Sequence, residues 1–246
     1  IYEVATSFFF QFYLFLLSFT KEYTTFPYKS APMFVFSEKN SIANQFLAEL
    51  RDVKIQEDPM RFRRNLERLG ELFAYEISTT FTFKTIDVTT PLGTKQVTVP
   101  KQLPTLATIL RAGLPMYQGF LNIFDRAPSA FIGAYRGAHK TDNSYDIEIH
   151  YTTTPSLTDK TLILIDPMLA TGKSLHLVYK RLRHFGEPVK VHVVAAIASQ
   201  QGIDYIQEQI EEVQIWVGDV DETLNAKSYI IPGLGDAGDL AFGEKL

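Results

Sequence analysis

The chain has 246 residues, of which 46% are hydrophobic, and its formal net charge is -4 with a pI near 5.8. This length supports one sizeable hydrophobic core but is short for two full-sized domains. The acidic balance excludes a general attraction to polyanions, so nucleic acid is not expected as a partner and any phosphate needs a local site. The absence of cysteine excludes disulfides and thiol chemistry and fits a cytoplasmic protein.

Residues 1–32 differ from the rest of the chain. Residues 8–19 read FFFQFYLFLLSF, an apolar run that is shorter than the roughly 20 residues needed to cross a bilayer. A signal peptide would have basic residues ahead of such a run, whereas this chain has Glu3. The first methionine is Met33, where ordinary globular composition resumes. We expect residues 1–32 to result from upstream translation and to lie outside the fold, with residues 33–246 as one domain and no membrane partner. The alternative is an interfacial anchor.

Two helices and a hairpin are predicted next. Residues 41–78 have a helical pattern, and Asp58-Pro59 predicts the N-cap and first position of the second helix. Its apolar stripe consists of Phe62, Leu66, Leu69, Leu72, Phe73 and Ile77, and its arginines are expected to form a solvated face. Residues 81–88 and 95–99 flank a Pro-Leu-Gly turn and predict a protruding β-hairpin.

Short apolar runs then alternate with helical stretches. Such runs predict an α/β fold with a parallel sheet covered by helices on both faces. The ligand of such a sheet binds beyond the carboxyl ends of the strands, so the loops after the runs are the candidate site. The runs are residues 106–110, 130–135, 161–165, 191–198 and 213–217.

The segment 161–185, TLILIDPMLATGKSLHLVYKRLRHF, predicts a strand, a loop and a helix that starts near Gly172. A phosphate at this helix start would receive free backbone N–H groups and the positive end of the helix dipole, with the Thr171 and Ser174 hydroxyls as further donors. Asp166, at the end of the strand, can accept hydrogen bonds from two ribose hydroxyls. This combination favours a sugar phosphate as ligand.

Two other interpretations of this loop need weighing. Gly172-Lys173-Ser174 matches the end of an ATP-binding P-loop, but that motif requires glycine at position 167, where the chain has Pro167. Simple helix capping by Asp166 and Thr171 is the other interpretation.

Three further segments carry a family resemblance. They are residues 109–116 (ILRAGLPM), 134–136 (AYR) and 229–243 (YIIPGLGDAGDLAFG). With DPMLATGKS at 166–174, they resemble the uracil phosphoribosyltransferase family from about residue 41 to the C-terminus. The resemblance implies a type I phosphoribosyltransferase fold, a β-arm at the subunit interface of a homodimer or larger assembly, and a small C-terminal hood over the base. An ordinary edge hairpin is the alternative for the β-arm.

The resemblance also implies the residues that bind phosphoribosyl pyrophosphate. Arg111 and Arg136 would hold its diphosphate, for which a guanidinium fork is suited, although a surface ion pair is the alternative for Arg111. Residues 137–145 would form a flap that excludes water. Magnesium would accompany this substrate and contact Asp236 through water. The full implied set is Arg111, Arg136, Asp166, Pro167, Met168, Leu169, Ala170, Thr171, Gly172, Lys173, Ser174 and Asp236, of which Arg111, Arg136 and Asp236 are catalytic.

The implied uracil contacts are Ile230, Gly235, Asp236 and Ala237. Uracil presents an acceptor, a donor and an acceptor along one edge, which a backbone N–H, C=O, N–H series matches when glycine permits close approach. Cytosine reverses two of these groups and should be rejected.

One residue departs from the family pattern, because Lys173 stands where these enzymes usually have a second glycine. The implied reaction is the conversion of uracil and phosphoribosyl pyrophosphate to UMP and pyrophosphate. The alternatives are a regulator that keeps the fold without turnover and a nucleoside kinase that uses ATP.

Overall fold

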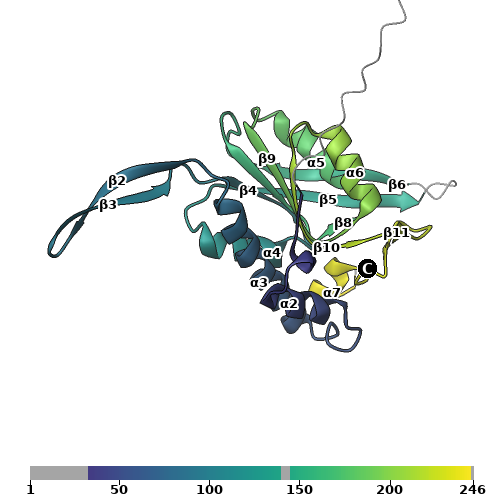
Figure 1. Cartoon of the computed structure of the whole chain (residues 1–246). Helices are drawn as coiled ribbons and strands as arrows, with labels where there is room; N and C mark the ends of the chain where they lie inside the picture. Colours follow the sequence, from purple (N-terminus) through teal and green to yellow (C-terminus); the bar gives the residue numbers. More distant parts are fainter. Residues whose placement is uncertain (1–32, 140–144, 245–246) are drawn as a thin grey trace, which may run out of the picture. The chain divides into compact units, whose positions relative to one another are not determined.

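The core of the fold is a sheet with strand order β1-β10-β9-β7-β4-β5-β6, seen in a computed structural model that describes residues 33–139 and 145–244 (Figure 1). Neighbouring strands are parallel except for β5 and β6, which are antiparallel. The five predicted buried strands are all present, so the predicted α/β fold is confirmed. The strands are β1 Met33–Val35, β4 Thr105–Leu110, β5 Ser129–His139, β6 Tyr145–Thr153, β7 Thr161–Ile165, β9 Lys190–Ser199 and β10 Gln214–Asp221, with a short β8 Met168–Leu169 beside β9.

Both edge strands of the sheet were missed by the sequence pattern. β1 has only three residues, and it pairs with β10 through Met33, Phe34 and Val35. The two ends of the stretch expected to form a flap, residues 137–145, belong to strands: residues 137–139 end β5 and Tyr145 begins β6. His139 pairs with Tyr145. The residues between them, 140–144, lie outside the described residues, as do residues 1–32.

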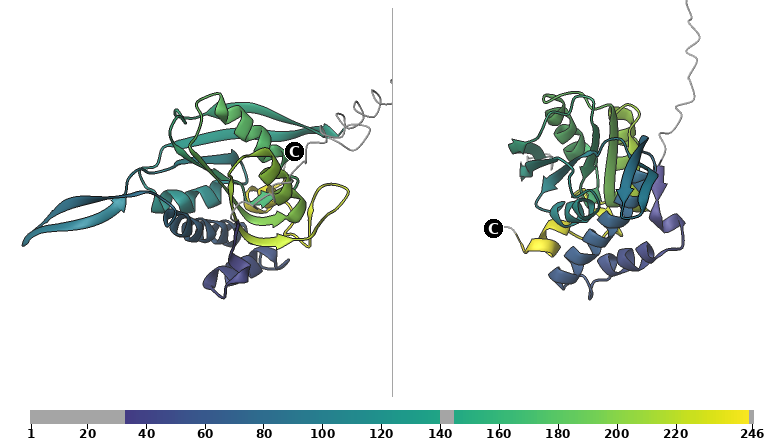
Figure 2. Two further views of the ribbon diagram at one scale, coloured as in Figure 1. Left: turned by 45° about the horizontal axis from the view of Figure 1, so that its top comes forward. Right: turned by 90° about the vertical axis from the view of Figure 1, so that its left-hand side faces the viewer.

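Helices cover both faces of the sheet, as predicted (Figures 1 and 2). Side chains alternate along a strand, so Ile163 and Ile165 of β7 belong to one core cluster and Leu162 and Leu164 to the other. The first cluster includes residues of α2 Ile42–Arg51, α3 Pro59–Ser78, α4 Leu114–Ile123 and α7 Ala237–Phe242, and the second includes residues of α5 Lys173–Arg183 and α6 Gln200–Gln209. None of the described helices is both long and apolar enough to cross a membrane.

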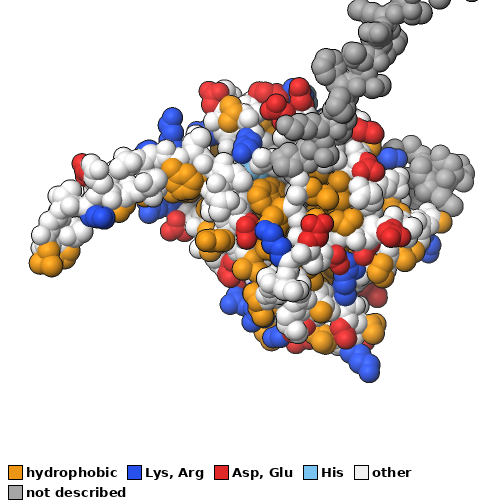
Figure 3. Space-filling view, in the orientation of Figure 1, with side chains coloured by type: hydrophobic (Ala, Val, Ile, Leu, Met, Phe, Trp, Pro, Cys, Tyr) orange, Lys and Arg blue, Asp and Glu red, His pale blue; other side chains and the backbone are white. Residues whose placement is uncertain are grey.

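The predicted hairpin forms an arm that extends away from the sheet (Figure 1). β2 Phe83–Thr90 and β3 Gly93–Pro100 are antiparallel and make a separate two-stranded sheet. Apolar side chains are exposed along the arm (Figure 3). Leu92, in the turn between β2 and β3, is 99% exposed. The arm therefore presents apolar surface that the described part of the chain does not cover.

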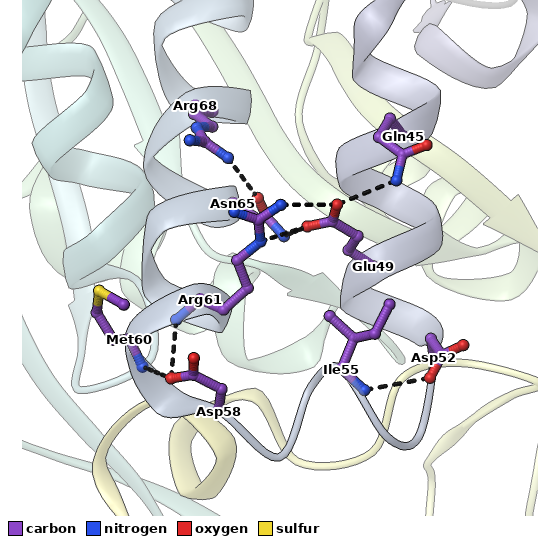
Figure 4. Close-up of polar contacts among 9 residues, drawn as sticks. All are labelled: Gln45, Glu49, Asp52, Ile55, Asp58, Met60, Arg61, Asn65 and Arg68. Carbon is purple, nitrogen blue, oxygen red and sulfur yellow. Dashed lines mark hydrogen bonds and ion pairs between the residues drawn. The ribbon is translucent and has the colours of Figure 1, made fainter.

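The α3 helix begins as predicted, because the Asp58 side chain accepts hydrogen bonds from the N–H groups of Met60 and Arg61. Its arginines do more than face solvent. Arg61 donates to both carboxylate oxygens of Glu49 on α2, at 2.6 and 2.9 Å (Figure 4). Arg63 donates to the carbonyl of Ala241 at 2.6 Å and so connects α3 to α7.

Glu49 is 7% exposed and joins α2 to α3 (Figure 4). Besides Arg61, Gln45 donates to Glu49 at 3.0 Å and Asn65 at 2.7 Å. The hydrogen bonds from Arg61, then from Gln45 and Asn65, lower the pKa of Glu49 to about 2. The carboxylate is therefore charged at neutral pH, and its charge is shared among three donors.

Replacement of Glu49 by Gln should lower the free energy of unfolding at pH 7 by about 1–2 kcal/mol, because charge-assisted hydrogen bonds are lost. A carboxyl group with a lowered pKa stabilises the fold above its ordinary value of 4.5, and this contribution disappears as the pH falls toward 2. The difference between wild type and E49Q in urea denaturation should therefore shrink over that pH range. Glu187→Gln is the control, since Glu187 forms an ion pair with Arg183 in which both side chains are at least half exposed. A difference that stays constant down to pH 2.5 would contradict this role.

Candidate functional site

The order in which the chain adds strands to the sheet reverses between β4 and β7. The chain proceeds from β4 to β5 on one side, and from β7 to β9 and β10 on the other. Such a point leaves a crevice beyond the carboxyl ends of the strands, where ligands of open α/β sheets bind. Thr108 of β4 pairs with Ile165 of β7. The loop with Arg111 and the loop with Asp166 therefore begin side by side.

The loop after β7 has the predicted strand, loop and helix order. Gly172 is the N-cap of α5, which begins at Lys173, and Lys173 itself is exposed. The carboxylate of Asp166 accepts from the N–H of Met168, and the hydroxyl of Thr171 accepts from the N–H of Lys173, both at 3.4 Å. The Asp166 contact closes a turn ahead of the helix, and only the Thr171 contact reaches the first turn of α5, whose N-cap Gly172 makes no side-chain cap. A phosphate at this helix start is compatible with that arrangement, because the first-turn N–H groups of a helix have no intrahelical partners.

Contacts from β9 and α6 fix the position of this loop. The Pro167 carbonyl accepts from the N–H groups of Ala196 and Ile197, at 3.0 and 3.1 Å. The Ser199 hydroxyl donates to the Ala170 carbonyl at 2.6 Å and accepts from the Gly202 N–H at 3.0 Å. Sequence reasoning missed Ser199, although a serine between a strand and a helix is a common N-cap signal.

Arg111 joins the loop after β4 to the C-terminal segment. Its Nη2 donates to Asp239 Oδ1 at 3.1 Å and to the Gly243 carbonyl at 3.3 Å. The Arg111 side chain is 40% exposed, so the ion pair suggested by sequence is present but open to water. Arg136 lies on β5 opposite Ile147 of β6, and its side chain lies outside the described residues.

The hood lies after β10. β11 Thr223–Leu224 pairs with β12 Ile230–Ile231, and a short loop then leads to α7. Ile230 and Ala237 are 3% and 1% exposed, and their side chains pack in the hydrophobic core. Gly235 is exposed, with a φ of +93° that favours glycine. Asp236 is the N-cap of α7 and accepts from the N–H groups of Gly238 and Asp239.

The acidic residues of the site are few. Among the described residues, no three His, Cys, Asp or Glu side chains are grouped so that they could hold a metal ion. Asp236 and Asp239 are both partly exposed in the hood, and a magnesium ion that arrives with a phosphorylated substrate needs only one or two carboxylates. Asp236 and Asp239 are therefore the carboxylates of the hood that a substrate-bound magnesium ion could contact.

A mostly parallel sheet flanked by helices, with a strand–loop–helix segment beside an arginine-bearing loop at its switch point, is the arrangement expected of the phosphoribosyltransferase class. The family model described as uracil phosphoribosyltransferase matches residues 37–244, and the chain belongs to this family.

Relatives cover most of the chain. The uracil phosphoribosyltransferase of Porphyromonas gingivalis is 52% identical over 209 residues, which are 85% of this chain and 96% of the relative. That of Pyrococcus furiosus is 38% identical over 203 residues, 81% of this chain and 85% of the relative. Among solved structures, the AQ2163 protein from Aquifex aeolicus superposes with a TM-score of 0.76 at 32% identity, over 86% of this chain and 98% of that one.

Replacement of Gly172 by Ala should destabilise the fold by about 1–3 kcal/mol and displace the loop, because a φ of +74° is strained for alanine. A Cβ atom there would also lie 2.9 Å from a ring carbon of Tyr205 on α6. Gly93→Ala is the matched control, since a Cβ at that position in the arm meets nothing within 4 Å. The midpoint of urea denaturation should fall for G172A and stay near wild type for G93A. Equal midpoints for the two variants would contradict the role of Gly172.

Proposed function

We propose that this chain catalyses the reaction of uracil with phosphoribosyl pyrophosphate to give UMP and pyrophosphate. The observation that carries the proposal is the meeting of the Arg111 loop and the 166–174 loop at the switch point of the sheet, in a member of this family. The relatives are named for this activity. Residues 33–246 would form the single phosphoribosyltransferase domain.

The 5-phosphate and the ribose would bind at the loop after β7. The N-terminus of α5 supplies backbone N–H groups and a positive dipole end for the phosphate, and Thr171 and Ser174 add hydroxyl donors. Asp166 would accept hydrogen bonds from the ribose hydroxyls. The support of this loop by Ser199 keeps the donors in place, so little ordering is required when the substrate binds.

The diphosphate would bind to Arg111 and Arg136. Arg111 pairs with Asp239 through one guanidinium nitrogen, and its partial exposure makes that ion pair weak enough to be exchanged for a diphosphate. Magnesium bound to the substrate would neutralise further charge on the leaving group, with Asp236 as a contact through water.

Uracil would bind against the backbone of the hood. The buried side chains of Ile230 and Ala237 leave only their main-chain groups for a base, and Gly235 offers an exposed main chain next to Asp236. This pattern fits recognition of the O4, N3–H and O2 edge by backbone groups.

In the proposed reaction, N1 of uracil bonds to C1 of the ribose while the bond from C1 to the pyrophosphate oxygen breaks and the N1 proton is lost to water. Positive charge develops on the ribose and negative charge on the leaving group. Catalysis would come from orienting the two substrates and from arginine hydrogen bonds to the departing diphosphate.

We further propose that the chain forms a homodimer or larger assembly, which the arm supports. Its exposed apolar side chains, Phe83, Ile86, Val88 and Leu92, offer surface that a second copy would cover.

The function is tested with purified protein, labelled uracil, phosphoribosyl pyrophosphate and magnesium. UMP should form from uracil, and replacing uracil by cytosine should abolish product because buried backbone groups would remain unpaired. A nucleoside kinase would instead require uridine and ATP, and a regulator would turn over neither pair. Folded protein that forms no UMP would overturn the proposal.

Arg111→Ala should reduce kcat by about 10²–10³-fold, the usual effect of removing one donor to developing charge in a transition state. The fold should persist, since the Arg111 side chain is partly exposed. Arg126→Ala is the matched control, because Arg126 is 88% exposed and its ion pair within the described part of the chain is with the neighbouring Asp125, at 3.7 Å. Turnover near the wild-type level in R111A would refute the assigned role.

A further inference from the structure

A cluster of charged side chains connects α2 to the hood. Arg51, the last residue of α2, donates through Nη1 to Asp221 Oδ2 and to the Gly233 carbonyl, both at 2.9 Å. Its Nη2 donates to Asp219 Oδ2 at 2.8 Å and to Asp221 Oδ1 at 3.0 Å. Asp219 and Asp221 lie at the carboxyl end of β10. Arg51 and Asp221 are 20% and 7% exposed, so their charges are largely removed from water.

Gly233 is the point where this cluster reaches the hood. Its N–H donates to Asp221 Oδ2 at 3.1 Å while its carbonyl accepts from Arg51, so the peptide groups on both sides of the residue are held by side chains. Gly233 is buried, and a Cβ atom at this position would lie 2.1 Å from the Ile230 carbonyl. The path of the backbone is therefore fixed just ahead of Gly235.

We propose that Arg51 and Asp221 are positioning residues for the base. They do not touch it, but they hold the Gly233 peptide groups so that the backbone of Gly235 and Asp236 is ordered before uracil binds. The inference rests on the proposed function, which gives the base to this segment. A backbone cradle has no side chains to adjust, so its fit depends on how well the main chain is held.

Two conservative variants test the inference. Arg51→Lys keeps the charge but loses the planar fork that spans Asp221 and the Gly233 carbonyl. Asp221→Asn keeps the shape of the side chain and one oxygen acceptor for the Gly233 N–H, but it removes the charge that opposes Arg51. In both variants KM for uracil should rise by about tenfold, the scale of one charge-assisted hydrogen bond. KM for phosphoribosyl pyrophosphate should change by less than about twofold, because its loop is held by β9 and α6 instead.

Arg61→Lys is the matched control. Like Arg51, Arg61 makes a two-pronged contact with a carboxylate of low exposure, here Glu49 of α2. That contact joins α2 to α3 and does not involve the hood. R61K should lose stability in urea denaturation while both KM values stay near wild type.

The possible outcomes distinguish a failure of the proposed function from a failure of the positioning role. If the wild-type protein forms no UMP, the proposed function is wrong and the inference falls with it. If the wild type is active but R51K and D221N raise both KM values equally, or neither, the function stands and the positioning role is wrong. Circular dichroism verifies folding, and loss of the folded state in both variants would assign the cluster a structural role and also overturn the inference.

Discussion

The constraint on which the rest of the structure depends is the burial of a parallel sheet on both faces. Parallel strands that are covered by helices must all return in the same direction, so their carboxyl ends collect at one edge. Because β4 leads to one side and β7 to the other, this edge contains the topological switch point, where open α/β sheets bind their ligands. The loops that carry Arg111 and Asp166 begin side by side because of this topology, since the hydrogen-bond register of β4 and β7 places the two strand ends together.

Charged side chains in this fold differ in their contacts according to how deeply they are buried. Glu49 and Asp221 are nearly buried, and each accepts several hydrogen bonds, as an unpaired carboxylate there would be costly. Arg111 and Asp239 are more exposed, and their single contact is longer, at 3.1 Å. Buried pairs hold the framework rigid, whereas an exposed pair can be exchanged for a ligand at little cost. Under the proposed function, the diphosphate would replace one carboxylate contact of Arg111 by stronger, two-pronged contacts.

The sequence predicted those features that depend on local patterns. The five buried strands, the N-cap at Asp58, the hairpin and the start of α5 all follow from periodicity and capping over a few residues, and each is found in the structure. Features that depend on distant partners were missed. Arg51 and Asp221 are 170 residues apart in the chain, and nothing near either residue indicates the other. β1 is short and recognisable only through its pairing with β10, and the Ser199 contact with Ala170 depends on the order of the strands.

The two halves of the candidate site, the loop at 166–174 and the hood, are held in place by different parts of the fold. The loop at 166–174 is held by β9 and α6, and the hood by α2, α3 and the end of β10. Lys173, which departs from the family pattern, is exposed at the start of α5 and lies outside both sets of buried contacts. A change at that position therefore leaves the support of the phosphate loop intact and does not reach the hood. Under the proposed function, binding of the phosphoribosyl group and choice of the base can therefore vary independently, because neither supporting network includes the loop that the other one holds.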